Sequence, residues 1–166
     1  MLRFLDSVDR NSAVRVTTEE SRKRVKVLYV EDNLSNVALM QRILARHEHV
    51  DLVTAMSGAL ALNLAQLHRP ALVLLDLHLP DVSGEDVLRQ LRQDPACRGI
   101  PVVVLSADAT PAQIDRLVSA GAYAYLTKPL DLKPFMALLD EVLDHKDSGR
   151  GHRATSSPPA FSASSG

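Results

Sequence analysis

Short, mostly apolar runs alternate with amphipathic segments through the middle of the chain. The runs are too short for buried helices, and their apolar character is typical of strands covered on both faces of a sheet. They cover residues 25–30, 50–55, 71–75, 100–105 and 123–126. The pattern therefore predicts five buried strands.

The segments between these runs carry helical spacing and helix-capping residues. The predicted N-caps are Asn33, Ser57, Thr110 and Asp131, and a further helix begins near Ser83. The fourth helix has the fullest set of signals, which are a capping-box Gln113, Pro111 at the first helical position and Gly121 beyond the end. The side chains expected to face the core are Val37, Met40 and Leu44, then Leu60, Leu64 and Leu67, then Val87, Leu88 and Leu91, and finally Leu132, Phe135, Leu139 and Val142.

Five strand–helix repeats indicate an α/β fold. Right-handed crossovers between successive strands give a parallel sheet with helices on both faces. Because five units are too few to close an eight-stranded barrel, the prediction is an open, doubly wound, five-stranded parallel sheet.

Composition changes divide the chain into three zones. Residues 1–24 are mixed in character and end in a basic cluster, which is typical of a linker or arm. Residues 25–145 hold the strand–helix repeats. Residues 146–166 are rich in Gly, Ser, Ala and Pro, and such a segment cannot bury enough apolar surface to order, so a disordered tail is expected.

The overall composition excludes several classes of protein. The 166 residues carry a formal net charge of −1, so bulk attraction to nucleic acid or an anionic membrane is not expected. A single cysteine, Cys97, excludes an internal disulfide framework and fits a reducing cytoplasm. The N-terminal segment lacks the long apolar stretch of a signal peptide or membrane span.

Polar residues gather where the predicted strands end. Glu31 and Asp32 follow the first strand, Asp76 the third, Ser106 the fourth and Lys128 the fifth. Parallel sheets bind ligands beyond the carboxyl ends of their strands, so these groups should meet at one edge. Crowded carboxylates repel one another unless cations join them, and oxygen ligands suit Mg²⁺. The remaining space, lined by a hydroxyl, an ammonium and a metal, suits a phosphoryl group.

These residues lie within four stretches of recognisable sequence. Residues 30–33 read Val-Glu-Asp-Asn, and residues 74–84 read Leu-Leu-Asp-Leu-His-Leu-Pro-Asp-Val-Ser-Gly. Residues 105–107 read Leu-Ser-Ala, and residues 125–129 read Tyr-Leu-Thr-Lys-Pro. In this order and spacing, residues from about 25 to 143 resemble the receiver domain of two-component response regulators. The resemblance implies a flavodoxin-like sheet with strand order 2-1-3-4-5.

The resemblance also implies a role for each residue at the predicted edge. Asp76 matches the phosphoacceptor, and Glu31 and Asp32 match the acidic pair that holds Mg²⁺, with Asp32 as the direct ligand. The backbone carbonyl of His78 matches a further metal ligand. Lys128 matches the lysine that pairs with the acceptor and then with the phosphoryl oxygens.

A second set of positions matches the family's switch. Ser106 corresponds to the hydroxyl that binds the phosphoryl group, Tyr125 to the aromatic switch residue and Pro129 to a proline after a cis bond. The resemblance implies a histidine kinase or histidine phosphotransfer protein as phosphodonor, and an unidentified downstream protein. Tyr123 and Ala124 stand where many DNA-binding members carry two acidic residues, which argues against their charged dimer face.

Other functions remain possible on the sequence alone. An aspartate-nucleophile phosphatase would use Asp76, but the second Asp of its Asp-x-Asp motif is replaced by His78. A flavin- or nucleotide-binding module would need a Gly- or Ser/Thr-rich loop after the first strand, whereas this chain has Glu31, Asp32 and Asn33 there. A receiver that works without phosphate is a further alternative, which the intact acidic and lysine positions disfavour. His78 and Asp108 either pair across the site or both point into solvent.

Overall fold

The computed structural model describes residues 24–107 and 110–147, and it confirms the predicted α/β class. The predicted linker and tail therefore lie almost wholly outside the described residues, as does Asp108. The elements, in chain order, are β1 (Val25–Val30), α1 (Leu34–Leu44), β2 (Val50–Ala55), α2 (Gly58–His68), β3 (Leu72–Asp76), α3 (Gly84–Gln93), β4 (Val102–Ser106), α4 (Pro111–Ser119), β5 (Ala124–Thr127) and α5 (Leu132–Asp147).

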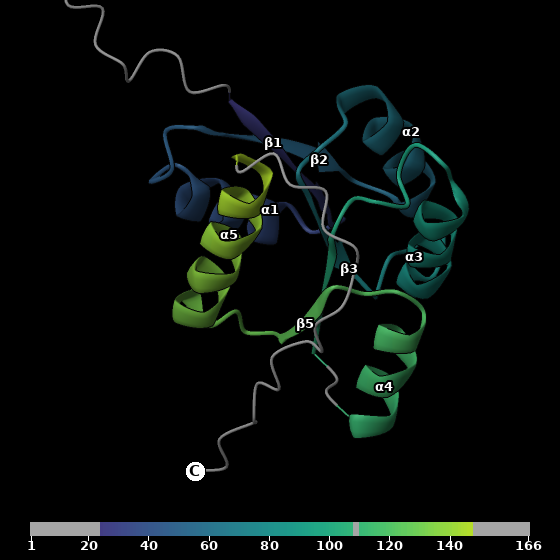
Figure 1. Ribbon diagram of the computed structural model, residues 1–166. Coiled ribbons are helices and arrows are strands. Elements are labelled where there is room, and N and C mark those ends of the chain that lie inside the picture. Colours follow the sequence, from purple (N-terminus) through teal and green to yellow (C-terminus); the bar gives the residue numbers. More distant parts are fainter. Residues whose placement is uncertain (1–23, 108–109, 148–166) are drawn as a thin grey trace, which may run out of the picture.

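All four strand pairings are parallel, and the sheet order is β2-β1-β3-β4-β5, as the resemblance implied. Helices α1 and α5 cover one face of the sheet, and α2, α3 and α4 cover the other (Figure 1). The chain winds outward in opposite directions from β1 and β3. The carboxyl ends of these two strands therefore border the crevice where ligands bind in such sheets.

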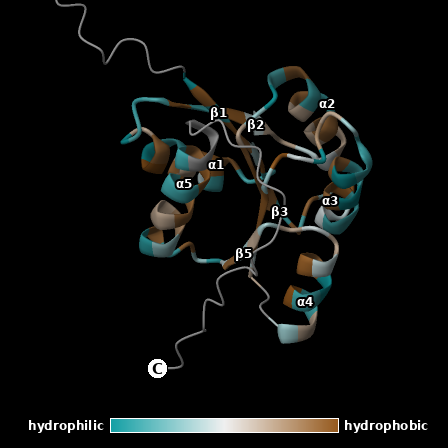
Figure 2. Ribbon diagram, viewed as in Figure 1, coloured by the Kyte–Doolittle hydropathy of each residue, from teal (hydrophilic) through white to brown (hydrophobic). Residues whose placement is uncertain are grey.

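Each face of the sheet has its own apolar core. Leu88, Leu91 and Leu117 pack on the face covered by α2, α3 and α4, and Phe135 and Leu139 pack on the face covered by α1 and α5. Strands β3 and β4 are buried along their whole length, which explains their nearly unbroken hydrophobicity; Figure 2 shows β3 in the hydrophobic colour. Within the described ranges, no helix combines the length and apolar character needed to span a membrane.

Most of the predicted helix boundaries are confirmed. The Asn33 side chain accepts the backbone N–H groups of Ser35 and Asn36 at 2.9 and 3.2 Å. Thr110 accepts the N–H of Gln113 at 3.3 Å, and Gly121, at φ +101°, follows the end of α4. The inward faces predicted for α1 and α3 are buried as expected.

The inward face predicted for α2 is wrong at two of its three residues, since only Leu64 packs against the core. Leu60 and Leu67 are 47% and 73% exposed, whereas Ala61 and Ala65 are fully buried. Small side chains let the helix lie close to the sheet and α3, and a Cβ on Gly58 would come within 2.7 Å of Val82. Because α2 is apolar on both faces, its leucine spacing did not reveal which face packs.

Leu132 was also expected to face the core, and it is 47% exposed. It is the first residue of α5, and the buried side of the helix begins at Phe135, which is fully buried.

The N-terminus of α2 is capped by a residue from another part of the chain. Ser57 occupies the cap position but makes no side-chain capping hydrogen bond. Instead, the two carboxylate oxygens of Asp81 accept the N–H groups of Gly58 and Ala59, each at 2.9 Å. Asp81 lies in the loop between β3 and α3, so this contact ties that loop to α2.

This contact predicts that Asp81→Ala lowers the urea concentration at the midpoint of unfolding, while Ser57→Ala changes it little. Asp81 satisfies two helix N–H groups and places a negative charge at the positive end of the helix. Hydrogen bonds from Ala59 and Gly58 lower the pKa of Asp81. Its contribution is therefore present above the pKa of an unfolded aspartate, about 3.9, and is lost as pH falls through the lower folded pKa. Equal midpoints for the two variants at neutral pH would contradict the capping role.

Candidate functional site

Three carboxylates meet at the carboxyl edge of the sheet. Val30 and Leu75 are register partners on β1 and β3, so the residues that follow them, Glu31 and Asp76, lie side by side. Oxygens of Glu31, Asp32 and Asp76 lie within 4.8 Å of one another. Glu31 and Asp76 are buried, whereas Asp32 is exposed. The predicted acidic cluster is thus brought together by the topology of the sheet.

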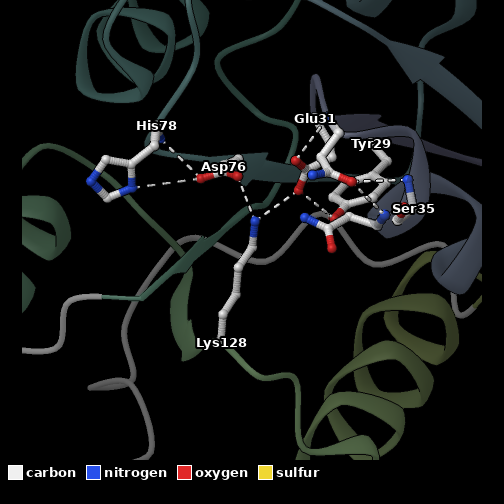
Figure 3. A network of polar contacts seen from close by, with 8 residues as sticks. Tyr29, Glu31, Ser35, Asp76, His78 and Lys128 are labelled. Carbon is white, nitrogen blue, oxygen red and sulfur yellow. Dashed lines mark hydrogen bonds and ion pairs between the residues drawn. The ribbon is translucent and has the colours of Figure 1, made fainter.

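Lys128 reaches into this cluster from the loop after β5. Its Nζ donates to Glu31 Oε2 at 2.7 Å and to Asp76 Oδ2 at 2.5 Å (Figure 3). The lysine side chain is 24% exposed, and the two carboxylate side chains are 1% and 7% exposed. The following Lys128–Pro129 bond is cis, as the resemblance implied. One ammonium therefore bridges two buried carboxylates that belong to different strands.

The surroundings favour the charged forms of both Glu31 and Lys128. Burial acts to raise the pKa of Glu31, but hydrogen bonds from Lys128, Tyr29 and Asn36 outweigh it and lower the pKa. Burial acts to lower the pKa of Lys128, but its hydrogen bonds to Asp76 and Glu31 raise it instead. The pair is therefore held as a carboxylate and an ammonium, because each group supplies the charge that makes burial of the other tolerable.

The backbone around Asp76 is closely packed. The N–H of His78 donates to Asp76 Oδ1 at 2.9 Å, and the N–H of Gly84 donates to the Leu77 carbonyl at 3.1 Å. A Cβ on Gly84 would lie 2.5 Å from the Asp76 carbonyl oxygen and 2.6 Å from Leu77 Cα. The start of α3 thus presses directly on the backbone of Asp76, and only glycine fits there.

His78 turns its ring toward Asp76. Its Nδ1 lies 3.9 Å from Asp76 Oδ1, and its side chain is 62% exposed (Figure 3). Pairing of His78 with Asp108 stays a prediction, since Asp108 lies outside the described residues.

The family model for the response regulator receiver domain matches residues 27–140. The chain belongs to this family. It is 34% identical over 117 residues to the polar-differentiation response regulator DivK of Brucella anthropi, a match that covers 70% of this chain and 94% of DivK.

Solved receiver domains have the same fold. That of a LuxO repressor protein from Vibrio parahaemolyticus is 30% identical, with a TM-score of 0.68, covering 78% of this chain and 99% of that one. That of the sensor histidine kinase PA1611 from Pseudomonas aeruginosa is 26% identical, with a TM-score of 0.65, covering 73% and 98%, and it holds a magnesium ion in its active-site cleft.

Receiver domains are the phosphoacceptor signalling modules of two-component systems, and they are generally not enzymes. Members of the family bind Mg²⁺ in an acidic active site and interact with histidine kinases or phosphotransfer proteins. The carboxylate oxygens of Glu31, Asp32 and Asp76 are hard ligands of the type that Mg²⁺ prefers, and the exposed Asp32 opens the cluster to solvent. Membership of this family therefore accounts for the site without the phosphatase and phosphate-independent alternatives.

The receiver domain also places the two predicted switch residues on one face of the sheet. Tyr125 is the register partner of Val104, and Ser106 lies two residues after Val104 on β4. Since side chains alternate along a strand, Ser106 and Tyr125 point to the same side, toward α2, α3 and α4. Ser106 is fully buried, and Tyr125 is partly buried against that core.

Sequence reasoning missed the residues that surround Glu31. Tyr29 donates its hydroxyl to Glu31 Oε2 at 2.8 Å, and the backbone N–H of Asn33 donates to Glu31 Oε1 at 3.2 Å. The alternation of side chains along β1 offered a signal for Tyr29, since it lies two residues before Glu31 on the same face.

The packing at Gly84 predicts that Gly84→Ala destabilises the receiver domain by about 1–3 kcal/mol, because the new methyl group must push the Asp76 backbone or α3 aside. Gly99→Ala is the matched control, since a Cβ there has nothing within 4 Å. Urea unfolding of both variants measures the difference. Similar free energies of unfolding would show that α3 can shift without cost.

Proposed function

We propose that Asp76 receives a phosphoryl group from the phosphohistidine of a histidine kinase or phosphotransfer protein in the cytoplasm. The observation that carries this proposal is the buried Asp76 carboxylate, paired with Lys128 Nζ inside an acidic cluster. One further property supports it: Gly84 packs against the Asp76 backbone and the N–H of His78 donates to the Asp76 carboxylate, so the nucleophile is held in place. Phosphoryl transfer depends mainly on such positioning and on neutralising charge.

The reaction exchanges one bond to phosphorus for another. A carboxylate oxygen of Asp76 bonds to phosphorus as the bond to the donor's histidine nitrogen breaks. The electron pair of that bond stays on the imidazole, which takes up a proton. Lys128 Nζ then turns from the Asp76 carboxylate to the new phosphoryl oxygens. Water later hydrolyses the acyl phosphate and restores the carboxylate, so the domain catalyses only its own phosphorylation and dephosphorylation.

Mg²⁺ would be held by Asp32, Asp76 and the His78 carbonyl. Glu31 would supply negative charge next to these ligands. When bound, the ion neutralises charge on the transferred phosphoryl group. The hydrogen bonds of Glu31 support this division of roles. Its Oε2 accepts from Tyr29 and Lys128, and its Oε1 accepts from Asn33, whereas Asp32 is exposed.

Ser106 and Tyr125 would report the phosphorylated state. Ser106 lies at the end of β4, one strand from Asp76, where its hydroxyl can move to a phosphoryl oxygen. Because Tyr125 lies on the same side of the sheet, its ring can follow into the space that Ser106 leaves. The surface formed by α4, β5 and α5 would then change its affinity for a downstream protein.

Intact-mass spectrometry after incubation with acetyl phosphate and Mg²⁺ tests the acceptor. The wild type should gain one phosphoryl group, Asp76→Asn should gain none, and excess EDTA should prevent the gain. Asp32→Ala should slow phosphorylation strongly, whereas Asp140→Ala, which removes an exposed carboxylate on α5, should not. Full mass gain in Asp76→Asn would refute the assignment.

Amide chemical shifts test the switch. Ser106→Ala should leave Asp76 able to accept the phosphoryl group, but the phosphorylation-induced shifts around Tyr125 should shrink. Ser119→Ala, at the exposed end of α4, is the control and should keep them. Undiminished shifts in Ser106→Ala would mean that Tyr125 responds by another route.

A further inference from the structure

Tyr29 is a buried polar residue beside the site that the proposed reaction does not use directly. Its side chain is only 2% exposed, and its ring packs in the core beneath α1 and α5. Its hydroxyl points out of that core toward the edge of the sheet and donates to Glu31 Oε2 at 2.8 Å (Figure 3). Nothing about apolar packing requires this hydroxyl, because phenylalanine would fill the same space.

Two donors converge on a single oxygen of Glu31. Tyr29 Oη and Lys128 Nζ lie 2.8 and 2.7 Å from Oε2. Glu31 is 1% exposed, so bulk water has little access to replace a donor that is lost, and an unsatisfied buried carboxylate oxygen is costly. The tyrosine and the lysine therefore hold Oε2, while the N–H of Asn33 holds Oε1 at 3.2 Å, and these donors together set the orientation of the carboxylate.

Packing alone does not fix the lysine. A cavity of about 140 Å³ lies against Lys128, and Tyr29, Met40 and Leu105 also line it. On that side the lysine chain has open space next to it, so the position of its ammonium depends on the carboxylates that it bridges. A carboxylate held at the correct angle by Tyr29 would determine where Nζ sits relative to Asp76.

We propose that Tyr29 is a positioning residue for phosphorylation of Asp76, because its hydroxyl orients Glu31 so that Lys128 Nζ lies against the acceptor. This inference rests on the proposed role of Lys128 at Asp76. The hydroxyl of Tyr29 donates to Glu31 and not to the acceptor, so Tyr29 would act through Glu31.

The first measurement is the rate of phosphorylation by acetyl phosphate. Tyr29→Phe keeps the ring and removes the hydroxyl, and it should slow the reaction about 3- to 10-fold, the range expected for the loss of one hydrogen bond of ordinary net strength. Tyr123→Phe is the matched control. It removes a hydrogen bond of the same kind, from Tyr123 Oη to Glu141 Oε1 at 2.7 Å, on the surface between β5 and α5. Its rate should equal that of the wild type.

The second measurement needs neither metal nor phosphodonor. The side-chain ammonium resonance of Lys128 should shift in Tyr29→Phe and stay in place in Tyr123→Phe. If the wild type accepts no phosphoryl group, the proposed function fails, but this resonance still decides whether Tyr29 places Lys128. An unshifted resonance, or a wild-type rate in Tyr29→Phe, overturns the inference.

A double substitution separates positioning from general packing. In a Glu31→Met background the hydroxyl of Tyr29 has lost its carboxylate partner, so adding Tyr29→Phe should slow phosphorylation no further. If the two substitutions instead multiply, Tyr29 acts independently of Glu31 and the inference is wrong. Urea unfolding of every variant ensures that rates are compared between folded proteins.

Discussion

The bridge from Lys128 to Glu31 and Asp76 is the interaction on which the site depends. The sheet order places the ends of β1 and β3 together, so two carboxylates are buried side by side where their charges would repel. Removing the ammonium would leave both without a counter-charge, a loss that costs several kcal/mol in buried pairs. The fold meets this constraint by extending the loop after β5 over the edge and directing one lysine between the two strands.

Even with this bridge, the site carries more negative than positive charge. Three carboxylates face one ammonium, so the cluster retains a negative excess that suits a divalent cation. Phosphorylation would then replace the Asp76 carboxylate by a group that carries more negative charge. Lys128 is the group best placed to respond, since it already contacts Asp76 and is attached to β5, the strand that carries Tyr125. If Tyr125 reports phosphorylation, charge balance and signal output would thus be connected through Lys128.

The strands and the functional edge could be predicted from the sequence because both follow from local rules. Apolar runs mark buried strands, and the carboxyl ends of parallel strands share an edge, so Glu31, Asp76 and Lys128 were expected there. The strand order that makes Glu31 and Asp76 neighbours was implied by the resemblance to receiver domains. Contacts between distant segments could not be predicted in this way. Asp81 caps α2 across 22 and 23 residues, and no spacing rule links it to that helix. The packing face of α2 was also hidden, because its leucines and its alanines both follow helical periodicity.

Asp76, the proposed acceptor, is held by contacts with α2 and α3, and its state would be read at β5. Asp81 ties the loop after β3 to α2, and Gly84 presses α3 against the Asp76 backbone, so both helices limit the movement of Asp76. Lys128 and Tyr125 belong instead to β5 and the loop that follows it. Since Asp76 has little room to move, the proposed phosphoryl group would have to be accommodated by Lys128 and by neighbouring residues of β4 and β5. This difference between the two sets of elements gives a physical reason why phosphorylation at the centre of the sheet would change the surface at one edge of it.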